Sequence, residues 1–344
     1  MDKTDIDSSV TATALEALLM PHLSNGRVIA LKRLSGGANM ETWSFDYIGD
    51  DELLAPLILR REPGIENHDE QQDGAKLGVS ALSLDTEAAL VSAVADMGVA
   101  VPKVVCIVPE HSPLGPGYVM SRESGEALPN KLFSEPQYAK ILPEIPFQAG
   151  VVLAGIHAVP VDSLPKLTPS LPLLTRLDDF QSLIDRFGNS SPVHQIAVDW
   201  LRKNQQPCPS LTLVHGDFRN GNLLIGPQGL SSVLDWELAH IGDPVEDLGY
   251  FCANVWRFGR YEKTAGGFGA AEDLLAGYLS VAGHAPSLSQ LRYWQLFAAL
   301  NWGLITLTML EMYRSGQDAT LERAAIGRRM SESEIDILLL LDDV

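Results

Sequence analysis

The chain has 344 residues, of which 25 are Lys or Arg and 44 are Asp or Glu, and its formal net charge is −19. This acidic balance argues against a protein that binds nucleic acid or docks on anionic lipid, because both need a basic surface. The length exceeds what one hydrophobic core usually supports, so we expect two lobes or domains.

The first third of the chain is predicted to be mostly β-structure, with one helix that begins near Asp85. A Gly-rich turn at residues 35–37 and a polar stretch at residues 64–80 separate the predicted strands. The polar stretch has the composition of a mobile lid, although a segment without function would have the same composition. Strands are predicted at residues 28–34, 42–47, 57–61, 103–107 and 117–120.

Helical patterns dominate after residue 125, interrupted by a short strand-and-loop insert at residues 212–234. This change predicts a sheet lobe of residues 1–120, a connector of residues 121–125 and a larger helical lobe of residues 126–344. Helices are predicted at residues 145–158, 173–187, 193–204, 270–281 and 287–311.

Residues 293–310 carry no charge and approach the length of a membrane-spanning helix. Because Gln295, Asn301 and Gly303 interrupt the apolar run, we expect a buried helix and no membrane partner. The N-terminus, MDKTDIDSSV, has no basic stretch before an apolar run, so no secretory signal is predicted. The three cysteines form no CxxC pair, which argues against a disulfide framework or a zinc site and suits a cytoplasmic protein.

The insert holds the strongest functional signal in the chain. The run HGDFRNGN follows one short apolar strand, and LDWE ends another, so Asp217, Asn222 and Asp235 stand on loops at neighbouring strand ends. Oxygen ligands of this kind suit Mg²⁺, which completes its coordination with phosphate oxygens and water. Phosphoryl transfer needs such a metal and a carboxylate that orients the attacking hydroxyl.

HGDFRNGN resembles the catalytic loop H-G-D-x-x-x-x-N of the aminoglycoside phosphotransferase and choline kinase branch of the protein-kinase-like superfamily, and LDWE resembles its metal-binding segment. The resemblance implies that Asp217 is the catalytic carboxylate, that Asn222 and Asp235 bind Mg²⁺, and that Arg219 contacts the transferred phosphoryl group. It also implies a bilobal, α+β protein-kinase-like fold. Its small antiparallel-sheet lobe would have one main helix, and its larger lobe would be mostly helical.

The same resemblance places ATP between the lobes. Backbone N–H groups of the Gly-rich turn would approach the phosphates, and the connector would contact the base, with Met120 as gatekeeper behind it. The residues implied are Ser35, Gly36 and Gly37 in the turn, and Met120, Ser121 and Glu123 at the connector.

A cation for the phosphates, paired with a glutamate of the following helix, is also expected, and Arg60 and Glu87 match in order and spacing. The superfamily usually has lysine where Arg60 stands. The arginine guanidinium is planar and permanently charged, and its reach differs from that of the lysine ammonium group. Leu-Arg is common in the acyl-CoA-dehydrogenase-associated subgroup of these phosphotransferases, so we expect activity to survive, with Arg61 as the alternative cation.

The leading hypothesis is therefore an ATP- and Mg²⁺-dependent kinase of a small-molecule hydroxyl. Asp243 follows only eight residues after Asp235, which leaves no room for a peptide-docking segment. The acceptor stays open between an aminoglycoside-like antibiotic, a hydroxyacyl-CoA and another hydroxylated metabolite. On a helix, Arg257, Arg260 and Lys263 would form a basic stripe for an anionic acceptor, although a solvated surface is the commoner role.

Two alternatives come from other classes. A nucleotide-binding pseudokinase with a regulatory role would explain the arginine at position 60. A metal-dependent hydrolase built on His215 lacks a second histidine at ligand spacing and is disfavoured. We expect His215 to hold the loop backbone and Asp247 to brace the same loop. The oligomeric state is not predicted.

Overall fold

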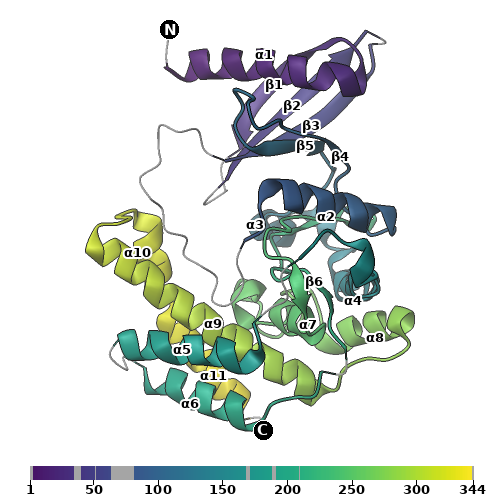
Figure 1. The fold of residues 1–344 in the computed structure, drawn as a ribbon. Coiled ribbons are helices and arrows are strands. Elements are labelled where there is room, and N and C mark those ends of the chain that lie inside the picture. Colours follow the sequence, from purple (N-terminus) through teal and green to yellow (C-terminus); the bar gives the residue numbers. More distant parts are fainter. Residues whose placement is uncertain are drawn as a thin grey trace.

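The computed structural model describes residues 3–34, 40–50, 52–62, 81–167, 171–187, 191–208 and 210–342. The predicted Gly-rich turn, with Ser35, Gly36 and Gly37, and the predicted lid at residues 64–80 lie outside these described residues. The chain forms a small sheet lobe above a larger helical lobe (Figure 1). This is the bilobal α+β arrangement that the sequence predicts.

The sheet lobe contains a five-stranded antiparallel sheet in the order β1-β2-β3-β5-β4. Residues of β2 alternate between buried and partly exposed positions, as expected for a strand with one covered face. The strands are β1 (Gly26–Leu34), β2 (Glu41–Gly49), β3 (Leu54–Arg61), β4 (Val104–Ile107) and β5 (Gly117–Ser121).

A long helix that the sequence analysis did not predict, α1 (Lys3–Leu23), covers one face of this sheet (Figure 1). Its Leu15 and Leu19 are fully buried and pack in one cluster with Trp43, Phe45 and Tyr47 of β2. Because the helix begins with a polar sequence, the pattern did not indicate that Leu15 and Leu19 attach it to the sheet.

The predicted helix, α2 (Leu84–Asp96), lies between the two lobes. Leu84 and Ala88 pack against Tyr118 of the sheet. Leu90 and Val94 join the main core of the helical lobe. Because α2 packs on both sides, it fixes the position of the sheet relative to the lobe below.

The five helices predicted for the helical lobe are confirmed, and the described residues form further helices between and after them. Two of the predicted helices, α4 and α8, cross closely at Gly150 and Gly277, where an added Cβ would lie 2.0 Å from a backbone oxygen of the facing helix. The helices are α3 (Pro129–Ser134), α4 (Ile145–His157), α5 (Leu173–Arg186), α6 (Pro192–Lys203), α7 (Val245–Phe251), α8 (Ala271–Ala282), α9 (Leu288–Ser315), α10 (Leu321–Gly327) and α11 (Met330–Asp342).

Helix α9 has the length and apolar composition of a membrane span, and it is the single helix of the described residues that does. It nevertheless packs inside the helical lobe against α5, α6, α7, α10 and α11. Trp294, Phe297 and Leu300 belong to the core that these helices share. The prediction that this segment is a buried helix is therefore confirmed.

The predicted insert forms two small antiparallel pairs, in which β6 pairs with β9 and β7 pairs with β8. Its loops face the sheet lobe, so they close the lower side of the space between the lobes. These strands are β6 (Thr212–Val214), β7 (Leu223–Gly226), β8 (Gly229–Val233) and β9 (His240–Gly242).

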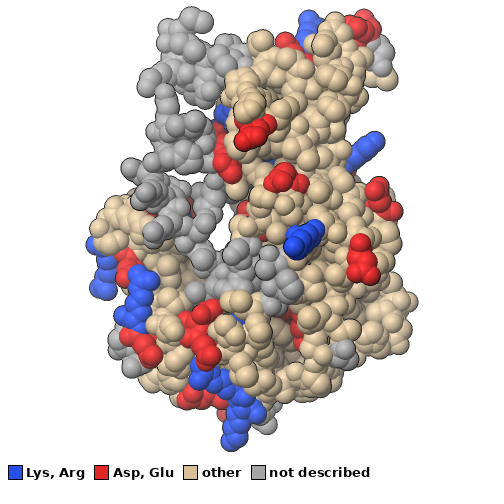
Figure 2. Space-filling view, viewed as in Figure 1, with Lys and Arg blue, Asp and Glu red and all other residues tan. Residues whose placement is uncertain are grey.

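Charged side chains are scattered over the face shown in Figure 2, and on the lower, helical part Lys and Arg lie beside Asp and Glu. Helices of this lobe form ion pairs such as Arg186–Glu311 and Arg202–Asp178. Exposed pairs of this kind contribute little to stability.

Candidate active site between the lobes

The loop after β6 is held from inside by His215, which is fully buried. Its Nε2 donates to the carbonyl of Leu234 at 3.0 Å, and its Nδ1 accepts the Asp217 N–H at 3.2 Å. Burial lowers the pKa of His215, which favours the neutral ring that this donor–acceptor pattern requires. These contacts agree with a structural role for His215.

Asp247 of α7 holds the same loop from below. Its carboxylate accepts the backbone N–H groups of His215 at 2.8 Å and Gly216 at 2.9 Å, and it lies 3.2 Å from His157 Nε2. Gly216 has a φ of 79°, and an added Cβ would lie 2.5 Å from the carbonyl oxygen of Leu238. The loop therefore needs glycine at this position.

The structure brings three predicted site residues together around the Asp217 carboxylate, which is almost completely buried. Asp217 Oδ1 lies 3.2 Å from Arg219 Nε, and Asp217 Oδ2 accepts a hydrogen bond from Asn222 Nδ2 at 2.8 Å. Because Asn222 uses its Nδ2 in this way, its Oδ1, the atom that a metal would need, lies outside these bonds.

Sequence reasoning missed the fourth member of this group, Tyr250 of α7. Its hydroxyl donates to Asp217 Oδ1 at 2.8 Å, and its ring lies 5.4 Å from that of Trp256. The Arg219 guanidinium stacks over the Trp256 ring, 4.5 Å from the ring centroid. No motif in the sequence marks Tyr250, because its distance from Asp217 depends on how α7 packs.

The second loop reaches the site beside Asn222. The Leu234 N–H donates to the Asn222 carbonyl at 2.8 Å. Asp235 is the next residue in the chain, so it stands at the end of the strand beside Asn222. Asp235 has a φ of 66°, a left-handed conformation that Asp tolerates better than most residues and that turns its side chain out of the strand. An amide oxygen and a carboxylate from adjacent loops form a donor set that suits Mg²⁺.

Within the described ranges, no group of three His, Cys, Asp or Glu side chains is arranged to hold a metal ion.

Across the cleft, the predicted pair of Arg60 and Glu87 is formed, with Arg60 Nε 3.2 Å from Glu87 Oε2. The same guanidinium also contacts Asp235 at 2.9 Å and Glu237 at 2.8 Å through its Nη2. Burial raises the pKa of Glu87 to about 7, against the opposing effect of Arg60. Burial alone would lower the pKa of Arg60, but the surrounding carboxylates raise it.

Arg61, the alternative cation, points elsewhere. It pairs with Glu41 at 2.9 Å and lies 5.5 Å from the Trp43 ring centroid, in the sheet lobe. Of the two arginines, Arg60 is the one that lines the cavity between the lobes.

This cavity has a volume of about 320 Å³. Its polar wall is formed by residues of both lobes, and its apolar wall includes Val91, Met120 and Leu128. The predicted site residues among its lining are Arg60, Glu87, Met120, Asn222 and Asp235.

The connector lies beside this cavity without lining it. The N–H groups of Ser121 and Arg122 already donate to the carbonyls of Lys103 and Pro56. The Ser121 hydroxyl is hydrogen-bonded to Glu123. The N–H of Glu123 takes part in neither of these backbone bonds.

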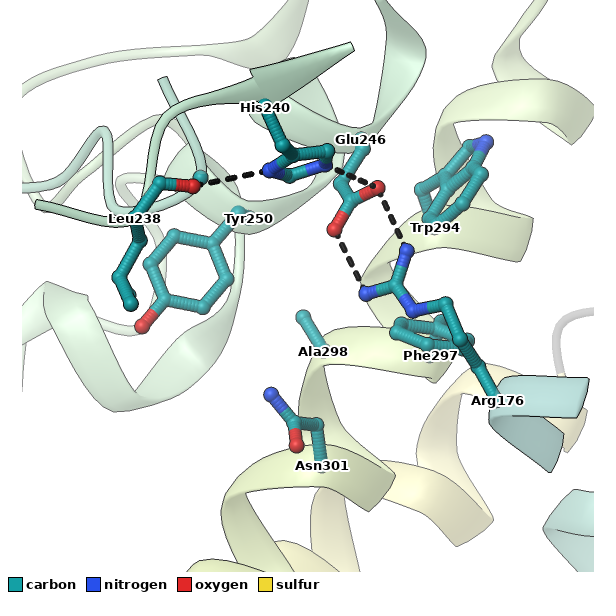
Figure 3. Close-up of a pocket in the computed structure, with 10 residues that line it drawn as sticks. Arg176, Leu238, His240, Glu246, Tyr250, Trp294, Phe297, Ala298 and Asn301 are labelled. Carbon is teal, nitrogen blue, oxygen red and sulfur yellow. Dashed lines mark hydrogen bonds and ion pairs between the residues drawn. The ribbon is translucent and has the colours of Figure 1, made fainter. Parts of the chain in front are cut away.

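A smaller cavity of about 30 Å³ is lined by Gly216 of the loop after β6 and by Tyr250, which is labelled in Figure 3. At its wall Arg176 of α5 forms two 2.8 Å bonds to Glu246 of α7, and His240 lies 3.6 Å from the same carboxylate. Burial would raise the pKa of Glu246, but Arg176 and His240 hold it below its usual range. This network anchors α7 at the residue before Asp247.

The predicted basic stripe is not formed. Residues 254–257 are a short 3-10 turn, and Phe258 has a φ of 49°, so no continuous helix joins Arg257, Arg260 and Lys263. Arg257 instead donates to the backbone carbonyl of Cys252 at 2.8 Å, and Arg260 stacks 4.5 Å from the Phe133 ring centroid. The glycines and the left-handed residue of this segment interrupt the helical spacing.

Known proteins resemble the chain in sequence over part of its length. Acyl-CoA dehydrogenase family member 10 of Mus musculus is 30% identical over 208 residues, which are 57% of this chain and 18% of that protein. The probable acyl-CoA dehydrogenase IBR3 of Arabidopsis thaliana is 27% identical over 230 residues, 60% of this chain and 26% of that protein. The chain thus matches about a quarter or less of the length of these relatives. Their names agree with the acyl-CoA-dehydrogenase-associated subgroup that the sequence predicts.

Solved structures resemble the whole fold. A Ralstonia eutropha protein described as an aminoglycoside phosphotransferase has a TM-score of 0.71 at 19% identity, covering 96% of this chain and 98% of that one. Spectinomycin phosphotransferase APH(9)-Ia, solved with ADP and spectinomycin, has a TM-score of 0.64 at 12% identity, with coverage of 96% and 98%. At these identities the likeness concerns the fold, and it confirms the predicted kinase-like architecture.

The family model described as "Phosphotransferase enzyme family" matches residues 31–284. This range includes both loops of the insert and the Arg60–Glu87 pair, and it confirms the predicted class of enzyme, a small-molecule phosphotransferase. Because the match spans most of the sequence and every predicted site residue, the chain belongs to the phosphotransferase enzyme family.

Proposed function

We propose that this protein transfers the γ-phosphoryl group of ATP to a hydroxyl group of a small molecule, with Mg²⁺ as cofactor. One observation carries the proposal. The Asp217 carboxylate is held against Asn222, and the neighbouring Asp235 contacts Arg60 of the Arg60–Glu87 pair at 2.9 Å, in a cavity that both lobes line. A kinase needs these groups on two sides of one nucleotide.

Each group then has a role that its contacts support. Asp217, fixed by three donors, orients the acceptor hydroxyl and accepts its hydrogen bond. Asn222 and Asp235 would hold the metal, which would supply positive charge against the nucleotide phosphates. Arg219 contacts the transferred group, and Arg60 contacts the other phosphates.

The nucleotide would lie between the lobes, which we take as residues 1–120 and 126–344, joined by the connector at residues 121–125. Met120 would lie behind the base, and the Ser121 carbonyl and Glu123 N–H would contact its edge. The Gly-rich turn with Ser35, Gly36 and Gly37 keeps its predicted role at the phosphates. We also infer a cytoplasmic setting, where ATP is available.

The acceptor is a hydroxylated small molecule. Spectinomycin in a complex of similar fold supports an antibiotic. The names of the curated relatives support a hydroxyacyl-CoA. ADP release from ATP and Mg²⁺ should therefore be measured with aminoglycosides, hydroxyacyl-CoAs and other hydroxylated metabolites.

Asp217→Asn, which keeps the size of the side chain, tests the assignment. We expect this variant to bind ADP as the unchanged protein does and to lose ADP release with every acceptor. Asp178→Asn, at an exposed carboxylate of α5, is the control and should keep full activity. A fully active Asp217→Asn variant would refute the proposal, and nucleotide binding without turnover by the unchanged protein would favour the pseudokinase alternative.

A further inference from the structure

The guanidinium of Arg60 joins three elements that meet at the cleft. Its Nε contacts Glu87 of α2 at 3.2 Å, and its Nη2 contacts Asp235 at 2.9 Å and Glu237 at 2.8 Å, both on the loop after β8. The Arg60 side chain is 14% exposed, so these contacts are largely shielded from water. A single cation thus holds the proposed metal-binding loop against the sheet lobe.

We propose that Arg60 couples metal binding to nucleotide binding. Before the metal binds, its guanidinium neutralises Asp235 and Glu237. When a metal takes over the Asp235 carboxylate, Arg60 becomes available to the nucleotide phosphates. The inference rests on the proposed function, and it adds a task for Glu237, which holds Arg60 on the loop.

The balance of charge at this point supports the coupling. Among the residues that the structure describes here, one guanidinium contacts three carboxylates, so these four groups together carry no surplus positive charge to attract phosphates. Burial is the main cause of the raised pKa of Glu87, and the negative charges of Asp235 and Glu237 add to it. Nucleotide phosphates entering without a metal would meet like charges at short range, which strongly disfavours binding.

The coupling also gives a reason for arginine at this position. Arg60 uses two different nitrogens, Nε toward Glu87 and Nη2 toward the loop. A lysine ammonium is one compact charge and lacks this fork. Arginine can therefore stay paired with Glu87 while its other end exchanges a carboxylate for a phosphate.

Glu237 is the residue at which the coupling can be altered without moving the loop. Its backbone carbonyl accepts the Leu82 N–H at 2.7 Å, which fixes the loop independently of the side chain. Glu237→Gln should therefore change the charge around Arg60 and keep the position of Asp235.

The test measures the dissociation constant of ADP by calorimetry, with excess Mg²⁺ and with EDTA, on the full chain. In the unchanged protein we expect ADP to bind much more weakly in EDTA. Glu237→Gln should tighten binding in EDTA about tenfold and reduce the effect of Mg²⁺ by the same factor, a usual size for coupling between two sites. An unaltered Mg²⁺ effect in this variant would overturn the inference.

Asp318→Asn is the matched control. The Asp318 side chain is 23% exposed and contacts Arg323 at 2.8 Å, close to the 20% and 2.8 Å of Glu237 with Arg60, but it lies in the helical lobe before α10. It should leave the effect of Mg²⁺ on ADP binding unchanged.

A second pair of variants, built on Arg60→Lys, distinguishes the release of Arg60 from the loss of a negative charge at Glu237. With Arg60→Lys already present, Glu237→Gln should tighten metal-free ADP binding much less than tenfold. An equal gain in both backgrounds would show that Glu237 repels the phosphates directly, and the role of Arg60 would be wrong. If the unchanged protein bound no ADP with or without Mg²⁺, the proposed function itself would fail.

Discussion

The hydroxyl of Tyr250 lies 2.8 Å from Asp217 Oδ1, so a helix downstream of both motifs supports the predicted catalytic carboxylate. Burial and the negative charge of Asp217 raise the pKa of Tyr250, so this hydroxyl keeps its proton and donates. Arg219 lies on the same oxygen at 3.2 Å. The orientation of Asp217 therefore depends on three donors, because Asn222 Nδ2 also contacts its Oδ2 at 2.8 Å. Arg219 and Asn222 belong to the motif, and Tyr250 does not.

Replacing Tyr250 by Phe should lower kcat about tenfold or more, since a hydrogen bond to a charged group contributes roughly 1.5–3 kcal/mol. The KM for ATP should stay within about twofold, because the tyrosine does not line the cavity proposed for the nucleotide. Steady-state kinetics would measure both values. Tyr293→Phe removes a buried hydroxyl that donates to Leu201 and should leave kcat unchanged. Equal kcat in Tyr250→Phe and the unchanged protein would contradict the positioning role.

Gly216→Ala should disrupt the catalytic loop. Its φ of 79° is unfavourable for alanine by about 1 kcal/mol, and the added Cβ would press on the carbonyl of Leu238. We expect a lower melting temperature and a loss of ADP release. Gly155→Ala in α4, where nothing lies within 4 Å of the new Cβ, should keep activity and stabilise the helix slightly. Similar behaviour of the two variants would show that the loop tolerates a side chain.

Glu246→Gln should destabilise the protein by about 3 kcal/mol, because it leaves Arg176 buried without its counter-charge. The pKa of Glu246 is held below its usual range in the folded protein. The ion pair therefore contributes fully to stability at pH values above the pKa of Glu246 in the unfolded chain, and this contribution is lost as the pH falls through the pKa of the folded state. Denaturant unfolding at neutral pH would measure the difference. The exposed pair partner Glu311→Gln should cost less than about 1 kcal/mol. Equal losses of unfolding free energy in the two variants would mean that burial does not strengthen the ion pair between Arg176 and Glu246.

Asp336 of α11 predicts a pH effect of opposite sign. Burial raises the pKa of Asp336 to about 6 in the folded protein. The protonated carboxyl group therefore contributes stability at pH values below its pKa in the unfolded chain, and this contribution is lost as the pH rises through 6. Asp336→Asn should thus raise the melting temperature at pH 8 and leave it nearly unchanged at pH 4, with a gain of about 1 kcal/mol after allowance for solvent.

Asn254 Nδ2 can still donate to the new side chain, as it does to Asp336 Oδ1 at 2.6 Å. Asp318→Asn is the comparison, since Arg323 lowers the pKa of Asp318 and its loss should destabilise at pH 8. A fall in stability at pH 8 for Asp336→Asn would contradict the prediction.

The sequence predicted the parts of the site that are fixed by short spacing. His215, Asp217 and Asn222 belong to one loop, and Asp235 ends the strand that pairs beside it, so their proximity follows from local structure. Arg60 and Glu87 were predicted from their order along a strand and the next helix. The buried character of α9 was also readable, because polar residues interrupt its apolar run.

Other features depended on packing between distant segments. The basic stripe was an alternative that required Arg257, Arg260 and Lys263 to share one helix, and the left-handed conformation of Phe258 interrupts that helix. Helix α1 was not predicted, because its attachment rests on Leu15 and Leu19 meeting a sheet that lies later in the chain.

The amino-acid sequence by itself determined which residue types the two loops carry, and these are the residues of the proposed chemistry. The tertiary structure decided which groups control those ligands. Arg60 meets Asp235 across 175 positions of sequence, and Tyr250 meets Asp217 across 33. Contacts of this range leave no periodic signal, because they arise when two separately formed lobes and helices pack against each other.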